Sequence, residues 1–432
     1  MAVVTAGKWK AANGRVSGRK VSGEEKTFRP DWWLFLVTIV LLGFGIVMVF
    51  DASYPHAFEK HQDGAYWVKR QIVSAVIGLC GLFFAMAVPF HRWQRVAVPG
   101  LIFAFVLLIL VHFFGHGALG AQRWIGWGPF KMQPSELSKL ALVLYLAKVL
   151  AARPSAARDL WGGLLPVAGV AFLAVFLVER EPDMGTAITM LLTTLVVLYV
   201  AGARARWILG TLALATVVGL MIVWPHGGKS NYRWKRLTTF ANPSADPRNE
   251  GFQIYHSTVA LGSGGLTGLG FGESREKRLG NLPMQRTDFI FAIIGEEFGL
   301  VGTLGVLSGF LLLAARGYHI AQRAKDPFGS LLATGVTSMI VIPALLNIGV
   351  VTASIPTTGI PLPFISYGGS SLVPTLFGIG ILLNISQRPF YREQKPAKRL
   401  AYEETLPEYQ AGGSAEEAKS RLRAMRAEHG TG

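Results

Sequence analysis

The chain of 432 residues has little cysteine and little charge, and each shortage excludes a class of protein. Its single cysteine, Cys80, excludes a disulfide framework and any cysteine-based metal site. Charged residues make up 16% of the chain and hydrophobic residues 51%, whereas soluble globular proteins carry about 25% charged residues. With its long apolar runs, this composition predicts a protein that crosses a membrane many times rather than several soluble domains.

Several familiar site signatures are also missing. No His or Cys cluster has metal-ligand spacing, no serine triad is visible, and no phosphate-binding loop opens a helix. No cleavable signal peptide precedes the first apolar run, which starts near Trp32 after a long polar leader. The net charge of +16 fits nucleic acid or an anionic membrane surface. In so apolar a chain the membrane explains it more simply, and we expect no nucleic-acid partner.

Apolar windows predict an all-α membrane domain over residues 32–386. We expect ten transmembrane helices, at 32–50, 70–89, 97–114, 136–151, 162–178, 185–202, 207–224, 289–315, 329–351 and 372–386. The polybasic leader, 1–31, and the tail, 387–432, are polar and charged, which favours disorder in both.

Lys and Arg gather in the leader, in the tail and in the even-numbered connections between spans. Because cytoplasmic loops carry an excess of basic residues, both termini are expected to be cytoplasmic. Three external segments rich in Gly and Pro follow: 115–135, 225–287 and 352–371. The largest is 225–287, between the seventh and eighth spans. Such sequences disfavour long regular helices, so we expect the three loops to fold over the bundle as a compact cap.

The large external loop carries a positive excess that includes Lys229, Arg233, Lys235, Arg236, Arg248, Arg275, Lys277, Arg278 and Arg286. Long loops can escape the positive-inside rule, so the excess need have no function. Alternatively it forms a cationic surface that faces phosphate. The glycines between Gly262 and Gly272 would let backbone approach a ligand closely, although their spacing matches no nucleotide-binding motif.

Asp288 stands at the start of the eighth span. Its local sequence favours helix N-capping, worth about 1 kcal/mol. The cationic loop, the adjoining membrane and its place at a helix mouth favour a second role, as general base on a sugar hydroxyl. Glu296 lies about 80° round the same helix and roughly 12 Å deeper, whereas Glu297 points almost opposite. We therefore predict Glu296 as the interior partner of Asp288.

Other polar residues of the membrane region have two possible roles each. Lys139 is expected to pair with Glu136, one turn away, or with Asp288 or Glu296 of the eighth span. Ser135 is the expected cap of the fourth span. Gly295 and Gly299 are expected to permit close helix packing. Two further residues flank the external side: Asp183, expected to cap the sixth span, and Arg123, an interfacial anchor or a phosphate ligand.

Four segments occur in an order that resembles one known family. They read GAQRWIGWGPFKMQPSE, REPDMGTA, LPMQRTDFIFAIIGEEFG and TTGIPLPFISYGGSS. Together they resemble the SEDS family of shape, elongation, division and sporulation proteins. Members of that family are inner-membrane enzymes with ten helices. They polymerise peptidoglycan by glycosyl transfer between lipid II units, and they work with a class B penicillin-binding transpeptidase.

The resemblance implies roles for particular residues. The family's essential acid, in its TDFIFA motif, corresponds to Asp288, and the lysine after its QPSE motif to Lys139. We expect the diphosphate and sugars of lipid II and of the nascent glycan to lie near a set of polar residues, with a divalent cation such as Mg²⁺ or Mn²⁺ as a possible aid: Lys139, Glu136, Arg123, Arg233, Arg236, Lys277 and Glu296. The chain departs from the family at Met284-Gln285-Arg286, where Glu-x-His is usual.

Several functions remain open at this point. The segment 31–57 is more similar to the division branch of the family than to the elongation branch, which implies a place at the division septum among other divisome membrane proteins. The elongation branch is the first alternative. A flippase that moves lipid II without glycosyl transfer is the second, and a noncatalytic scaffold for the transpeptidase is the third.

Overall fold

The structure, a computed structural model, describes residues 29–115, 123–126, 132–223, 234, 240, 250–280, 282 and 284–387. In these residues the regular structure is helical apart from one isolated bridge between Ile125 and Met132. The predicted all-α class is therefore confirmed. Most of the leader and tail lie outside the described residues, as do Arg233 and Arg236 of the large loop.

Each predicted span overlaps a helix of the structure. These helices are α1 (Trp32–His61), α2 (Tyr66–Ala87), α3 (Trp93–Phe114), α4 (Pro134–Ala152), α5 (Leu165–Arg180), α6 (Met184–Val200), α7 (Ala205–Val223), α11 (Ile290–Arg323), α12 (Pro327–Val351) and α13 (Gly369–Ser386). Seven helical segments of the described chain are long and apolar enough to cross a membrane. They contain α1, α2, α3, α5, α11, α12 and α13; α6 and α7 are apolar but shorter, and α4 carries several charges.

Two helices run further than their apolar windows. The window for α1 stops at residue 50, yet the helix continues through Asp51 to His61, where Gln62 adopts a left-handed conformation (φ 55°). The Asp51 carboxylate, which ends the apolar window, pairs with Lys277 inside the protein. α11 likewise extends from the expected 315 to Arg323. Apolar windows therefore found these helices but underestimated their lengths.

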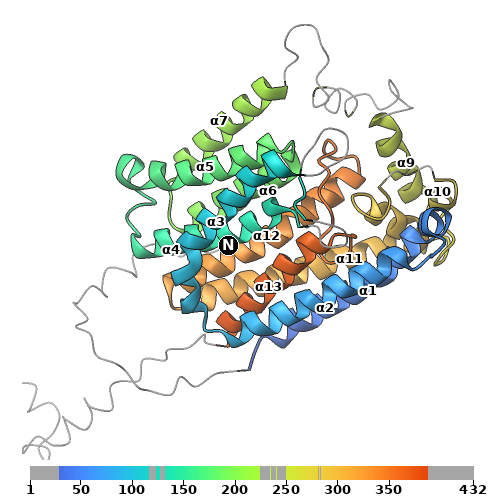
Figure 1. Ribbon diagram of the computed structural model, residues 1–432, viewed down its shortest axis with the longest axis horizontal. Helices are drawn as coiled ribbons and strands as arrows, with labels where there is room; N and C mark the ends of the chain where they lie inside the picture. The colour runs from blue at the N-terminus through green and yellow to red at the C-terminus, as the bar shows by residue number, and fades with distance from the viewer. Residues whose placement is uncertain are drawn as a thin grey trace, which may run out of the picture. The chain divides into compact units, whose positions relative to one another are not determined.

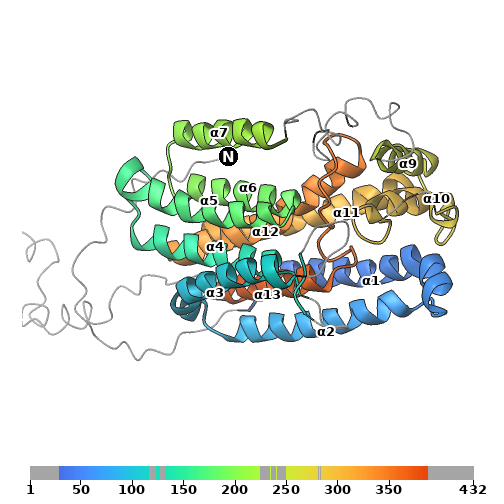
Figure 2. The same cartoon turned by 45° about the horizontal axis from the view of Figure 1, so that its top comes forward.

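The helix α12 is the centre of the packing in this part of the chain. It is buried along most of its length and contacts α4, α6, α9, α11 and α13 (Figures 1 and 2). α13 packs in turn against α2, where Gly380 lies against the Leu82 carbonyl so closely that a Cβ would come within 2.2 Å of its oxygen. Small residues thus bring helix backbones together, as is common in membrane bundles.

The described part of the large loop contains two helices, α9 (Glu250–Ser263) and α10 (Arg275–Arg278). The glycine content of the loop did not predict α9, a helix of 14 residues that ends just before the pair Gly264-Gly265. α9 packs on α11 and α12, and α10 packs on α1 and α9 (Figures 1 and 2). This placement agrees with a loop folded over the bundle.

The glycine-rich segment 264–272 docks against a break in α11. Gly299 leaves the helical conformation (φ 62°, ψ −156°), so it interrupts α11 instead of serving as a helix-packing glycine. Backbone amides of Leu269 and Gly270 donate to the Glu296 and Glu297 carbonyls, each at 3.0 Å, and the Leu300 amide donates to the Gly265 carbonyl at 3.0 Å. These glycines therefore let the loop backbone approach α11. An approach of the same backbone to a ligand stays a prediction.

Candidate active site

Asp288 lies in a turn, residues 284–289, that leads into α11. The N-cap of α11 is Phe289, which makes no side-chain capping bond, so the capping role predicted for Asp288 is wrong. Its backbone carbonyl accepts a hydrogen bond of 2.7 Å from Asn347 of α12, which donates a second of 2.7 Å to Ile360. The half-buried Asp288 carboxylate adjoins Gly359, whose Cβ would stand 3.7 Å from Oδ2.

The loop before α13 fixes the turn that carries Asp288. The Ser366 hydroxyl donates to the Thr287 carbonyl at 2.6 Å, and the Tyr367 amide donates to the Arg286 carbonyl at 2.9 Å. Gln71 of α2 donates to the Ser366 carbonyl at 3.2 Å. Asn347 of α12 and the loop before α13 therefore fix the backbone of the turn that carries Asp288, and Gln71 of α2 supports that loop in turn.

A small cleft of about 20 Å³ adjoins this turn. It is lined by residues of α4, α6, α12, α13 and the preceding loop: Glu136, Lys139, Thr186, Thr189, Met339, Pro343, Ile360, Pro361, Pro363, Ser371 and Thr375. Asp288 is not among these lining residues. Ile360 connects the two, because it lines the cleft and shares the Asn347 amide with Asp288. A second cavity of about 10 Å³ shares Lys139 and Met339 with the first and lies between α4 and α6, where its lining is mostly apolar.

Lys139 forms its ion pair with Glu136, at 2.8 Å, and both side chains are nearly buried. Of the alternatives left open by the sequence, the local pair is the one observed, and Lys139 does not pair with Asp288 or Glu296. Pairing within one helix turn leaves no charge of the pair unmatched in an apolar bundle. The two side chains line the cleft as a polar pair with no net charge.

At the starts of α4 and α6, one residue is placed as expected and one is not. Asp183 caps α6, accepting from the Thr186 amide at 3.3 Å. The N-cap of α4 is Gln133 instead of Ser135, because the Ser135 hydroxyl bonds the Asp183 carboxylate at 3.2 Å. Gln133 bonds the same carboxylate at 2.8 Å. Asp183 therefore ties α4 to α6 beside the cleft.

Arg123 holds the turn between α5 and α6. Its guanidinium donates to the Glu181 carbonyl at 3.1 Å and to the Pro182 carbonyl. The Glu181 carboxyl is buried, and neither of its oxygens has a hydrogen-bond partner among the residues that the structure describes. Burial raises its pKa to about 8, the charge of Asp183 adds to the rise, and Arg123 opposes it. Arg123 thus donates to the backbone of this turn. A contact between Arg123 and a substrate phosphate stays a prediction.

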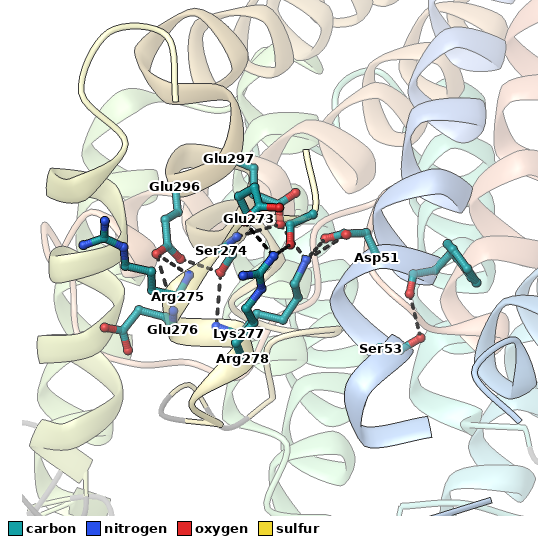
Figure 3. A network of polar contacts seen from close by, with 12 residues as sticks. Asp51, Ser53, Glu273, Ser274, Arg275, Glu276, Lys277, Arg278, Glu296 and Glu297 are labelled. Atoms are coloured by element: carbon teal, nitrogen blue, oxygen red, sulfur yellow. Dashed lines mark hydrogen bonds and ion pairs between the residues drawn. The ribbon is translucent and has the colours of Figure 1, made fainter. Parts of the chain in front are cut away.

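Lys277 and the two glutamates of α11 form a separate buried network (Figure 3). Lys277 Nζ contacts Asp51 of α1 at 2.6 Å and Glu297 at 2.6 Å, and its side chain is only 4% exposed. Glu296 accepts from the Ser274 hydroxyl at 2.5 Å and the Arg275 amide at 2.8 Å, at the start of α10. Glu297, and not Glu296, therefore makes the interior ion pair, and neither is paired with Asp288.

The buried network argues against two predicted substrate contacts. A diphosphate would have to displace the carboxylates of Asp51 and Glu297 to reach Lys277. Glu296 accepts hydrogen bonds from backbone amides in the first turn of α10. The physical reason is that the loop folds back on the side of α11, which the sequence alone does not reveal. Arg233 and Arg236 lie outside the described residues. Asp288, Glu136 and Lys139 are the predicted residues that the structure brings to one region.

Two residues that shape this region carried no prediction. Asp51 follows a long apolar run, and a charge at such a place is a signal of a buried partner. Asn347 is an amide within the apolar helix α12, and it positions both Asp288 and the cleft wall. An isolated amide in a membrane helix needs hydrogen-bond partners, so it also could have been singled out.

A bundle of long apolar helices with buried ion pairs is that of a multi-pass helical membrane protein. Its sequence identifies the family. Residues 32–390 match the family described as "Cell cycle protein", FtsW/RodA/SpoVE. The chain belongs to this family, as the four ordered motifs indicated.

Named relatives agree with this membership. The chain is 43% identical over 370 residues to the stage V sporulation protein E of Bacillus subtilis, covering 85% of this chain and 99% of that protein. It is 41% identical over 362 residues to the probable peptidoglycan glycosyltransferase FtsW of Geobacter metallireducens, covering 83% and 95%.

Solved structures show the same fold. One comes from work on the structural coordination of polymerization and crosslinking by a peptidoglycan synthase complex, with a TM-score of 0.69, 30% identity, and coverage of 84% of this chain and 99% of that one. The rod shape determining protein RodA of Thermus thermophilus gives a TM-score of 0.62 at 30% identity, with coverage of 84% and 98%.

Proposed function

We propose that this protein is a peptidoglycan glycosyltransferase that joins lipid II units and releases polyprenyl diphosphate. The observation that carries the proposal is the position of Asp288, on a turn whose backbone is fixed by hydrogen bonds beside a partly polar cleft, in a chain of this family. The names of relatives such as the Geobacter FtsW proteins support the reaction class.

In the proposed reaction Asp288 is the general base. Its carboxylate accepts the proton of the acceptor sugar's 4-hydroxyl while that oxygen bonds to the donor's anomeric carbon. The bond from this carbon to the diphosphate oxygen breaks at the same time, and the anomeric configuration inverts. The bonds from Asn347, Ser366 and Tyr367 to the turn hold the base in one position, which lowers the entropic cost of reaching the transition state.

The diphosphate that leaves carries charge that must be stabilised. Lys139 lines the cleft, although its ion pair with Glu136 offsets its charge. In the described part of the chain no group of three or more His, Cys, Asp or Glu side chains could hold a metal ion. Mg²⁺ usually keeps several waters and binds substrate phosphates, so a cation here would be held mainly by the diphosphate and water, and Asp288 can act as the base. A bound cation would neutralise charge on the leaving group.

The biological setting is part of the proposal. The FtsW names among the relatives favour septal synthesis during division, with other divisome membrane proteins nearby, over synthesis for elongation. The synthase complex among the similar structures supports a class B penicillin-binding transpeptidase as partner. We also infer ten membrane crossings at the bacterial inner membrane, with α4, α6 and α7 added to the seven longest apolar segments and both termini cytoplasmic.

Purified protein incubated with labelled lipid II tests the reaction, both alone and with its transpeptidase partner. Polymer from the wild type, and none from Asp288→Ala, is the expected result. Equal polymer from both proteins would exclude Asp288 as the base. Movement of lipid II across vesicle membranes without polymer would favour the flippase, and neither activity in the complex would favour a scaffold.

A further inference from the structure

Two arginines beside the catalytic turn lie on aromatic rings. Arg286, two residues before Asp288, stands 4.3 Å above the Trp67 ring, and Arg70 stands 4.6 Å from the Tyr66 ring centre. Trp67 meets Tyr367 edge to face, with ring centroids 5.1 Å apart. Five aromatic or basic side chains, three of them from α2, therefore gather where the loop before α13 meets the Asp288 turn.

Neither arginine is matched by a carboxylate in the residues that the structure describes. Ion pairs there use Lys139, Lys277, Arg278 and Arg316, among others, but not Arg70 or Arg286. The Nε atom of Arg286 is buried without a hydrogen-bond partner. Burial lowers the Arg286 pKa, and both guanidinium charges act on the Tyr367 hydroxyl. An uncompensated pair of partly buried cations is costly unless an anion binds there.

We propose that Arg70 and Arg286 form an anion subsite for the diphosphate group of a polyprenyl-linked substrate. The proposal rests on the proposed function, which supplies a ligand of this kind. Guanidinium groups bind phosphate oxygens through paired donors, and stacking on an aromatic ring holds the planar group in place. Both side chains are half-buried, so their donors can reach a bound ligand.

The position of Arg70 favours a diphosphate over another anion. It lies within five residues of the start of α2, a helix long and apolar enough to cross a membrane. The end of such a helix lies near the lipid headgroups, where the diphosphate of a polyprenyl-linked substrate is also located. The carboxylates of a stem peptide share the same chemistry, so an experiment has to separate the two sources.

Binding of undecaprenyl diphosphate to the purified full-length protein in detergent tests the subsite without requiring turnover. Undecaprenol, which lacks the phosphates, and the free stem pentapeptide are the comparison ligands. Arg70→Gln and Arg286→Gln are expected to raise the Kd for the diphosphate about tenfold or more each, since bonds to charged groups are strong. The Kd of Arg286→Lys should lie between those of the wild type and Arg286→Gln, because lysine keeps the charge and lacks the planar guanidinium group.

Arg278→Gln is the matched control, because Arg278 belongs to the same loop but is exposed and pairs with Glu273 at 2.6 Å. Its Kd should equal that of the wild type.

Thermal unfolding checks that each variant is folded. If Arg286→Gln does not fold, the Kd of Arg286→Lys is compared with that of the wild type. Equal Kd values in all variants, equal binding of undecaprenol, or competition by the pentapeptide in place of the diphosphate would each overturn the subsite. Diphosphate binding without polymerisation by the wild type would contradict the proposed function and leave the subsite standing.

Discussion

Glu181 is a buried residue in the turn between α5 and α6, and its backbone carbonyl accepts a hydrogen bond from Arg123. Its pKa of about 8 lies far above the ordinary value of 4.5, chiefly because of burial. Between these two values the folded protein keeps a proton that the unfolded chain has released. The contribution of Glu181 to stability is therefore full below about pH 4.5 and is lost as the pH rises to about 8.

Replacing this group with an uncharged amide tests that sign. Glu181→Gln removes the ionisation, so the variant should gain melting temperature relative to wild type as the pH rises from 5 to 8.5. Thermal unfolding in detergent at several pH values measures the difference. A difference in melting temperature that stays constant over this range would contradict a buried Glu181 carboxyl with a raised pKa.

The residue scale also shows where sequence reasoning reaches its limit at the site. Asp288 and the local Glu136–Lys139 pair could be named from the sequence, because charge at a membrane helix is rare and needs a reason. The ion pair of Lys277 could not be named in this way, since its partner Asp51 is distant in sequence and belongs to α1. Local rules about spacing cannot find a partner that only tertiary packing supplies.

At the scale of elements, the broken helix α11 depends on the loop that packs against its break. Gly268 has a left-handed conformation (φ 85°), and a Cβ there would come within 2.0 Å of the Glu297 carbonyl oxygen. Gly268→Ala should therefore destabilise the protein by about 2 kcal/mol or more. Gly262→Ala is the control, because no atom lies within 4 Å of its added Cβ. Similar melting temperatures for the two variants would mean that the loop is not docked in this way.

The buried triad of Asp51, Lys277 and Glu297 joins three elements, α1, α10 and α11 (Figure 3). Lys277→Met leaves two buried carboxylates without a cation and should destabilise the protein by about 3–5 kcal/mol. Arg278→Gln, next along the chain, breaks an exposed pair and should change stability by about 1 kcal/mol or less. Denaturant or thermal unfolding distinguishes them, and equal losses would argue that Lys277 is not buried.

For the whole molecule, apolar windows found every long helix of the described chain, because burial in lipid leaves a continuous apolar signal. They missed the ends of α1 and α11, the helix α9 and the break at Gly299. These features depend on one segment docking on another. The cleft wall likewise combines α4, α6, α12 and α13, and no single stretch of sequence contains it.

Chemical labelling of single cysteines tests the proposed orientation of the whole chain. With Cys80→Ala as background, a cysteine at the exposed position Arg278 should react with a membrane-impermeant maleimide in intact cells. A cysteine at the exposed Lys325, between α11 and α12, should react only after the membrane is opened. The opposite pattern would show that the large loop is cytoplasmic, and with it the Asp288 turn.

The kinetics of lipid II polymerisation by Asp288→Asn, in complex with the transpeptidase partner, test the central claim most directly. The amide keeps the size of the side chain and the backbone bond from Asn347, and it removes only the base. A base of this kind contributes roughly 10²–10⁴-fold to the rate, so kcat should fall by that factor while the KM for lipid II changes little. A variant that polymerises at the wild-type kcat would contradict the assignment of Asp288 as general base.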